Sequence, residues 1–184
     1  MNPLLSAGTC MTGSLIRLRA LTFHDLPYTL SWRNDQRSLR WFKSQEPLQS
    51  EAHEAWFQRY VAADTRDCMF FAETHDGMPV GQTSVYNFEP GARRAEVGRF
   101  LSAPDLRGKG LFREAMLLTL DWSFENLDLD ELHLEVFANN DRAIRLYRSA
   151  GFAESGASAG MLTMRLSRAD YLRAGGSGGL GVIQ

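Results

Sequence analysis

The spacing of apolar residues predicts helices and strands in a defined order along the chain. Residues 14–21 (SLIRLRAL) alternate apolar and basic side chains, which is the pattern of a half-buried strand. Residues 24–36 carry apolar side chains at helical spacing, and Ser50 is a suitable N-cap for a second helix. Three strands joined by short turns are then predicted at residues 68–74, 79–88 and 94–102. Helices followed by an antiparallel run of strands indicate an α+β fold.

The second half of the chain alternates helix and strand. We expect a helix at 111–126, a strand at 131–137, a helix capped by Asn139 or Asn140, and a strand at 160–167. Gly151 is suited to end the later helix as its C′ residue. Each helix in this half begins shortly after a strand ends, and ligands bind at such junctions.

Length and local composition suggest one domain with short ends. The chain has 184 residues, and we predict a flexible leader at 1–13, a folded domain at 14–168 and a glycine-rich flexible tail at 169–184. The leader lacks the basic stretch and long apolar run of a signal peptide. Because no apolar run is long enough to span a membrane, we expect a cytoplasmic protein without a membrane partner.

Charge and cysteine content narrow the function classes. The formal net charge of -2 disfavours a nucleic-acid partner held by bulk phosphate attraction. Cys10 and Cys68 are the two cysteines, with no CxxC pair and no ligand-like cluster of Cys and His, so no metal site is expected.

A glycine-rich turn precedes the predicted helix at 111–126. The stretch DLRGKGLFREA, residues 105–115, places Arg107 and Lys109 among glycines at the helix start. Free backbone N–H groups and the helix dipole make such a turn an anion site, with phosphate as the usual guest. The spacing fits neither a P-loop nor a dinucleotide fingerprint. The alternative is a solvated helix start that happens to contain Gly and Lys.

A second motif favours the anion site over the solvated helix start. Residues 139–152, NNDRAIRLYRSAGF, contain the pattern N-x-x-A-x-x-L-Y-x-x-x-G-F. Together with the Arg-x-x-Gly-x-Phe turn ending at Phe112, this resembles the GNAT superfamily of acyl-CoA-dependent N-acetyltransferases. The resemblance covers roughly residues 15–167. It implies a GNAT fold of the α+β class, with a central mixed, mostly antiparallel sheet of six to seven strands flanked by about four helices.

The resemblance also assigns the binding of acetyl-CoA as co-substrate. The family's turn binds the pyrophosphate, and the preceding strand binds the pantetheine arm. The residues implied for these roles are Phe100, Leu101, Ser102, Arg107, Gly108, Lys109, Gly110, Leu111, Phe112 and Asn140. Phe112 departs from the family, which has Gly or Ala there. We expect its ring to pack sideways, against the helix or the adenine end of CoA, because only its N–H is needed in the turn.

The same resemblance suggests catalytic groups. Tyr147 matches the family's tyrosine at the sulfur and would protonate the leaving thiolate; the alternative is a core aromatic. Glu135 is the first candidate for the base that takes the amine proton, and Glu96 is the second. A structural or surface role for either carboxylate stays open, and His133 is a weaker candidate.

The acceptor site in this fold is usually built by the first helix–loop–helix. The W-R-N-D run resembles the RimJ/RimL-like branch, and the region looks most like PseH-type nucleotide-linked amino-sugar N-acetyltransferases. The candidate acceptor residues are Trp32, Arg33, Arg40, Trp41 and His53, cations for a diphosphate and aromatics for stacking. The alternative is that the aromatics are core and the arginines solvated.

Three functions therefore remain. The first is acetyl transfer to a primary amine of a small molecule, best an amino sugar on a nucleotide carrier. The second is N-terminal acetylation of a ribosomal-type protein, which the arginines of the acceptor region disfavour. The third is a non-catalytic acyl-CoA sensor, which the retention of Tyr147 and Glu135 disfavours. A homodimer is compatible with the family and with the apolar C-terminal strand.

Overall fold

The computed structural model describes residues 9–63 and 66–176. Its helices are α1 (Leu26–Asn34), α2 (Gln36–Leu39), α3 (Ser50–Ala62), α4 (Leu111–Asn126), α5 (Asp141–Ser149) and α6 (Arg168–Arg173). Its strands are β1 (Cys10–Thr12), β2 (Ile16–Ala20), β3 (Cys68–Thr74), β4 (Pro79–Glu89), β5 (Arg94–Ser102), β6 (Glu131–Phe137), β7 (Ala153–Ser158) and β8 (Met161–Ser167). Short 3₁₀ turns precede α1, follow β4 and follow β5, at Phe23–Asp25, Pro90–Ala92 and Pro104–Leu106.

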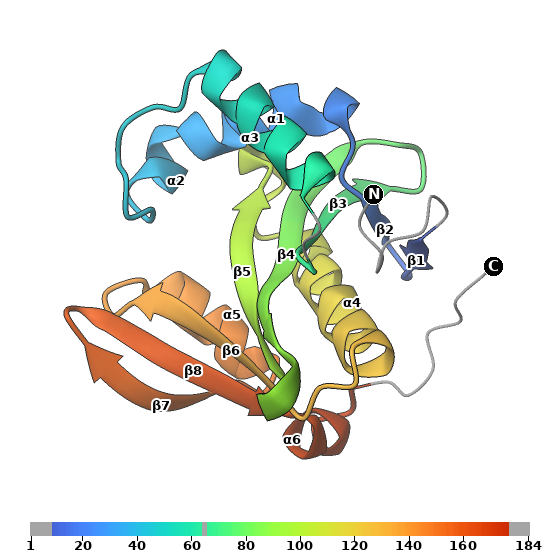
Figure 1. Ribbon diagram of the computed structural model, residues 1–184, viewed down its shortest axis with the longest axis vertical. Helices are drawn as coiled ribbons and strands as arrows, with labels where there is room; N and C mark the ends of the chain where they lie inside the picture. Colours follow the sequence, from blue (N-terminus) through green and yellow to red (C-terminus); the bar gives the residue numbers. More distant parts are fainter. Residues whose placement is uncertain (1–8, 64–65, 177–184) are drawn as a thin grey trace.

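Within the described residues, the strands form one eight-stranded sheet in the order β1-β2-β3-β4-β5-β6-β8-β7. Every neighbouring pair is antiparallel except β5 and β6, which are parallel. In Figure 1, α1, α2 and α3 gather at one end of the central strands, α4 runs along the sheet, and α5 lies beside β6. The predicted α+β class and mixed, mostly antiparallel sheet are confirmed, with eight strands rather than six to seven.

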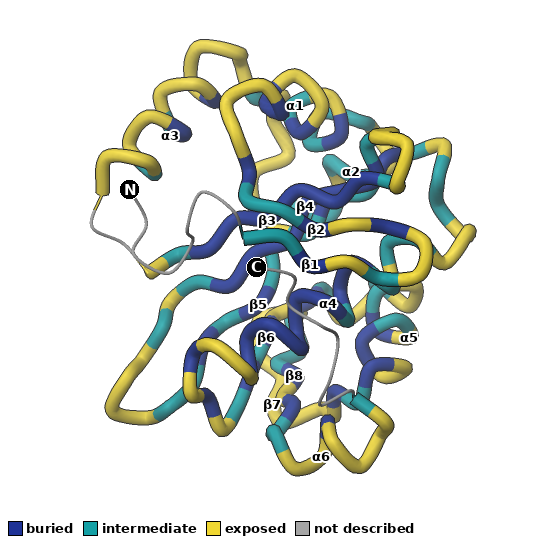
Figure 2. The backbone as a smooth tube through the Cα atoms, turned by 90° about the vertical axis from the view of Figure 1, so that its right-hand side faces the viewer, coloured by how far each residue is buried: buried dark blue, intermediate teal, exposed yellow. Residues whose placement is uncertain are grey.

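Strand β3 is buried on both faces and joins two hydrophobic cores. Phe70 and Ala72 face the core that includes α4, whereas Met69 and Phe71 face the core formed with α1 and α3. Side chains alternate across a strand, so a run of apolar residues is what a doubly covered strand requires. Figure 2 shows the central strands and α4 as buried, with the outward turns of α3 exposed.

The ends of the domain differ from the prediction where the structure describes them. Residues 10–12 of the predicted leader form β1, which pairs with β2 from Cys10 to Thr12. Part of the predicted tail forms α6, whose Tyr171 is buried against α4 and hydrogen-bonds Asp121 at 3.0 Å. Residues 1–8 and 177–184 lie outside the described residues, so their predicted flexibility stays a prediction. No helix in the described part of the chain is both long and apolar enough to cross a membrane.

Candidate active site

Strands β5 and β6 run apart after a short paired segment (Figure 1), and the residues beyond that segment line a large cleft. The two strands pair only from Arg94 to Glu96 on β5 and from Glu131 to His133 on β6. The residues that follow on both strands line a cavity of about 1540 Å³, together with α1 to α3 and the starts of α4 and α5. The divergence of two parallel strands therefore creates a site at the carboxyl end of each.

A β-bulge shapes the β5 wall of this cleft. Between the pairs Gln82–Leu101 and Ser84–Gly98, β5 contributes one residue more than β4. Arg99 takes up the extra length with a φ of 50°, and its carbonyl accepts a hydrogen bond from Gln82 Nε2 at 3.2 Å. A bulge leaves backbone groups out of the ladder. The predicted pantetheine contact at Phe100–Ser102 lies directly beside this interruption, and all three residues line the cavity.

The glycine-rich turn has the geometry of an anion site. Gly108 and Gly110 both have positive φ, 84° and 82°, and Gly110 is the N-cap of α4. The helix begins at Leu111 as predicted, so the N–H groups of its first turn have no acceptor within the helix. Gly108, Gly110 and Phe112 line the cavity, whereas Lys109 is exposed and Leu111 packs against the core. The turn therefore fits phosphate through its backbone more than through Lys109.

Arg107 makes contacts that the sequence did not indicate. Its Nη2 donates to Ser38 Oγ at 2.6 Å, its Nη1 lies 3.5 Å from Asp35 Oδ1, and its Nε donates to Ser102 Oγ at 3.3 Å. Burial lowers the pKa of Arg107 from its usual value. The guanidinium still lines the cleft, but it connects the turn to α2 instead of extending as an unattached charge beside the phosphates.

Phe112 points its ring at the sheet. The ring meets Phe100 edge-on, with centroids 5.8 Å apart, and a Cβ added at Gly81 would come within 2.8 Å of it. These partners are neither of the two predicted, since the ring packs on β4 and β5 and not on α4. The glycine at 81 provides the room that a bulky residue in this turn needs, and the sideways packing leaves only the Phe112 backbone at the helix start.

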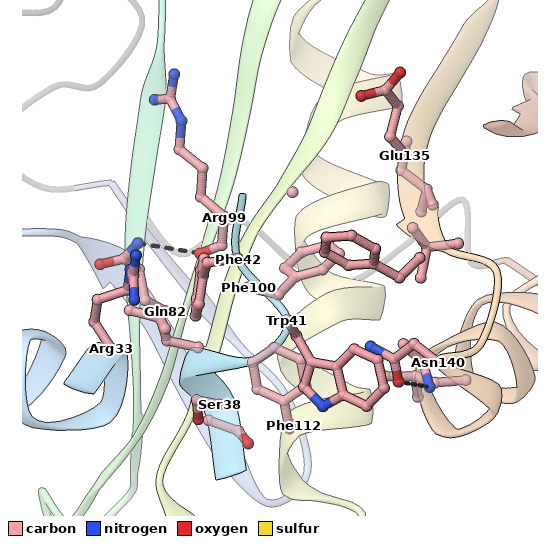
Figure 3. A pocket seen from close by; sticks show the side chains of 18 of the residues that line it. Arg33, Ser38, Trp41, Phe42, Gln82, Arg99, Phe100, Phe112, Glu135 and Asn140 are labelled. Atoms are coloured by element: carbon pink, nitrogen blue, oxygen red, sulfur yellow. Dashed lines mark hydrogen bonds between the residues drawn. The ribbon is translucent and has the colours of Figure 1, made fainter. Parts of the chain in front are cut away.

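Tyr147 and Asn140 bring α5 to the opposite wall. Tyr147 is buried, lies 5.8 Å from Phe100 between ring centroids, and lines the cavity. Burial raises the pKa of Tyr147, so its phenol stays protonated at neutral pH. Asn140 is the N-cap of α5, where its Oδ1 accepts from Ala143 N at 3.2 Å. Asn140 also lines the cavity (Figure 3), so capping and contact with a ligand are compatible.

The two candidate base residues differ in their surroundings. Glu96 accepts hydrogen bonds from Tyr86 Oη at 2.6 Å and from Asn87 Nδ2 at 2.9 Å. Burial, and then the bond to Glu96, raises the pKa of Tyr86. Glu135 has a side chain 46% exposed and pairs with Lys43 Nζ at 3.2 Å. Both carboxylates line the cavity, but only Glu96 is held in place by neighbouring uncharged donors.

One predicted acceptor residue lies in the core, and a second has a structural partner. Trp32 is buried and stacks on Phe71, with centroids 5.7 Å apart, and it is not among the residues that line the cavity. It belongs to the core between α1 and β3. His53 lines the cavity but is also buried, with its Nε2 2.8 Å from Thr29 Oγ1 and its ring stacked on Trp56. Burial lowers the pKa of His53, which therefore favours the neutral ring.

The other acceptor residues do line the cleft. Arg33 lies over the Phe42 ring at 3.9 Å and donates to the Ser44 carbonyl at 2.6 Å. Arg40 lies over Trp41 at 4.8 Å, and the rings of Trp41 and Phe137, which both line the cavity, have centroids 6.3 Å apart. The end of α1 and the loop after α2 thus bring cations and aromatic rings together.

Sequence reasoning missed two polar residues of β4. Gln82 and Tyr86 line the cleft and bond to β5 at Arg99 and Glu96. The signal was present, because Gln82, Ser84 and Tyr86 alternate with the buried Thr83 and Val85 in GQTSVYNF. Within the described residues, no cluster of three or more His, Cys, Asp or Glu side chains is placed to hold a metal ion.

Comparison with known proteins decides the family. The model of the acetyltransferase (GNAT) domain matches residues 16–153. This chain is a GNAT acetyltransferase. Spermidine N(1)-acetyltransferase of Escherichia coli (strain K12) is 31% identical to this GNAT chain over 142 residues, which cover 77% of it and 74% of the relative.

Solved structures agree with that assignment. Spermidine N-acetyltransferase from Vibrio cholerae, in complex with CoA and spermine, superposes with a TM-score of 0.78 at 26% identity, covering 87% of this chain and 99% of the other. The apo form of FdhC, described as a nucleotide-linked sugar GNAT, gives 0.78 at 17% identity over 90% of this chain and 93% of the other, which shows the shared fold alone. The GNAT enzyme described here is an acetyl-CoA-dependent N-acetyltransferase of a small-molecule amine.

Proposed function

We propose that this enzyme acetylates the primary amine of a negatively charged small molecule, best an amino sugar carried on a nucleotide. The observation that carries the proposal is the charge of the cleft. Ten lining side chains are Lys or Arg and three are carboxylates. The cations are Arg33, Arg37, Arg40, Lys43, Arg59, Arg99, Arg107, Arg113, Arg142 and Arg145; the carboxylates are Glu96, Glu135 and Asp141.

The cations divide between the two ligands. Those on the glycine-rich turn, α4 and α5 adjoin the proposed phosphate site of acetyl-CoA, and the others surround the acceptor end. In the described part of the chain, Arg33, Arg40 and Arg59 of the acceptor end form no ion pair with a carboxylate. Unneutralised cations attract an anionic acceptor and repel a polyamine, which carries several positive charges at neutral pH. The rings of Trp41 and Phe42 offer stacking surfaces for a base.

The mechanism that we propose uses Glu96 and Tyr147. When bound, acetyl-CoA supplies a thioester carbonyl that the neutral amine attacks as the C–S bond breaks. Glu96 Oε, directly or through a water, takes the proton that the amine nitrogen loses. Tyr147 Oη gives its proton to the departing sulfur, because a phenol is protonated at neutral pH and the thiolate that forms can accept that proton. We place Glu96 ahead of Glu135 as the base because hydrogen bonds from Tyr86 and Asn87 hold it in position.

A polyamine acceptor is the second candidate. It is favoured by the 31% identity to the Escherichia coli spermidine enzyme and by the likeness to the spermine complex from Vibrio cholerae. The RimJ/RimL branch, the PseH likeness, the N-terminal peptide activity and a homodimer stay predictions.

A single assay separates the acceptors. Release of CoA thiol is followed with a nucleoside-diphosphate amino sugar, with spermidine and with a peptide bearing a free N-terminus. We expect kcat/KM for the nucleotide-linked sugar to exceed that for spermidine by about 100-fold, and to fall as salt screens the cleft. Arg40→Gln raises KM for the anionic acceptor, whereas Arg165→Gln, on β8 and not among the cavity-lining residues, does not. Faster turnover of spermidine or of the peptide would reject the anionic acceptor.

A further inference from the structure

Gln82 carries a buried acceptor atom that the protein does not use. The residue is 4% exposed, sits in the middle of β4 and lines the cleft. Its Nε2 donates to the carbonyl of Arg99 at 3.2 Å, but its Oε1 is buried and makes no hydrogen bond. Buried polar atoms in folded proteins nearly always have a partner, so an orphaned oxygen in a ligand cleft points to a partner on the ligand.

The orientation of this amide is fixed by chemistry. A carbonyl oxygen accepts only from the NH₂ end of the amide, so turning the group over would set two oxygens against each other at the bulge. Figure 3 shows Gln82 beside the Arg99 backbone, on the side of the cavity that also carries Arg33. Oε1 is therefore a fixed hydrogen-bond acceptor in the part of the cleft that we propose binds the amine substrate.

The neighbours of Gln82 along β4 have no such unpartnered atom. Ser84 and Tyr86 lie on the same face at two-residue spacing. Ser84 Oγ donates to the Gly98 carbonyl at 2.9 Å, and Tyr86 Oη donates to Glu96 at 2.6 Å. All three side chains tie β4 to β5 around the bulge. Among these three, Gln82 alone keeps an unpartnered buried polar atom, and the residue that carries it lines the cavity.

We propose that Gln82 Oε1 accepts a hydrogen bond from an N–H of the acceptor's amino group, making Gln82 a specificity residue for primary amines. The inference rests on the proposed function only in taking an amine as the acceptor. The bond holds the amine nitrogen beside the bulge. Tyr86, the hydrogen-bond partner of Glu96, lies on the same face of β4 as Gln82. An amide oxygen carries no charge, so it recognises the N–H without competing for the proton that Glu96 takes.

Two substitutions separate this role from the tie to Arg99. Gln82→Met is close in shape and removes both the oxygen and the NH₂. Gln82→Glu keeps acceptor oxygens and removes only the NH₂ that donates to the Arg99 carbonyl. Ser84→Ala is the matched control, because it deletes a comparable tie to β5 and no orphaned atom.

The measurements are kcat and KM for the amine of the panel above that the wild-type enzyme acetylates fastest, with acetyl-CoA affinity and melting temperature for each variant. We expect kcat/KM for the amine to fall about 10- to 100-fold in Gln82→Met, to fall less in Gln82→Glu, and to stay within about twofold in Ser84→Ala. Acetyl-CoA affinity stays unchanged in all three.

Two results would overturn the proposal. The first is amine kinetics in Gln82→Met within twofold of wild type. The second is Gln82→Glu no better than Gln82→Met, which would mean that only the bond to Arg99 matters. If the fastest amine is spermidine and the ranking holds, the anionic acceptor is rejected while the role of Gln82 stands.

Discussion

At the scale of single residues, the two cleft carboxylates make different predictions. Glu96 is fixed by Tyr86 and Asn87, whereas Glu135 is about half exposed and pairs with an exposed Lys43. A base must keep its geometry while a proton moves, which favours Glu96. We expect Glu96→Gln to lower kcat by roughly 100-fold or more, and Glu135→Gln by less than about threefold. Single-turnover acetyl transfer with saturating amine measures both.

The two glutamates are matched controls for each other, since both line the cavity and both changes remove one charge. If Glu135→Gln were inactive and Glu96→Gln active, Glu135 on β6 would be the base. A similar small loss of kcat in both variants would indicate that a chain of water molecules takes the proton, and that neither carboxylate alone is the base.

Residue roles were harder to predict than residue positions. The sequence placed Trp32 among the acceptor residues, but its stacking partner Phe71 lies far along the chain on β3. Nothing local distinguishes a tryptophan that stacks on the core from one that stacks on a ligand. Arg107 is similar, because its contacts with Asp35 and Ser38 exist only once α2 meets the turn. Gln82 becomes informative only when the register at the bulge shows which of its atoms is bonded.

At the scale of elements, the turn before α4 makes a sharp prediction. Gly110 has a φ of 82°, which an alanine adopts only with strain, and it is the N-cap of the helix. We expect Gly110→Ala to lower the free energy of unfolding by about 1 kcal/mol and to weaken acetyl-CoA binding by about tenfold or more, because the N–H groups of the turn move. Equilibrium titration of acetyl-CoA measures the second effect.

Gly91→Ala is the control for that change. Gly91 lies in a turn with nothing within 4 Å of an added Cβ and no positive φ. We expect it to leave acetyl-CoA affinity unchanged. An unchanged dissociation constant for acetyl-CoA in Gly110→Ala would show that this turn does not bind the phosphates.

The elements themselves followed closely from the apolar pattern. The predicted segments 94–102, 111–126 and 131–137 have the bounds observed for β5, α4 and β6. β7 was missed because Ala153–Ser158 is exposed throughout and has no apolar alternation. That strand forms through its pairing with β8, which is a tertiary effect that local pattern does not contain.

At the scale of the whole molecule, the cleft joins the two cores. The proposed acceptor end is built on the core formed by α1, α3 and one face of β3, and the proposed cofactor end on the core around α4 and α5. Arg107 connects the ends, since it belongs to the turn before α4 and bonds Ser38 of α2. A ligand that lies along the cleft therefore touches both halves of the domain and stabilises the fold as a unit.

The last prediction follows from that arrangement. Acetyl-CoA at about 100 times its dissociation constant stabilises the native state by about 2.7 kcal/mol, which for a chain of this size raises the melting temperature by roughly 5–10 °C. We expect CoA to give a similar rise, because in the proposed binding mode its phosphates and pantetheine arm contact the turn and β5. Acetyl-pantetheine, which lacks the phosphates, gives little. Equal rises with acetyl-pantetheine and acetyl-CoA would contradict binding at the glycine turn, since the helix start acts on the phosphates alone. Gly110→Ala separates the two cases, because it reduces the rise with acetyl-CoA only if that turn holds the phosphates.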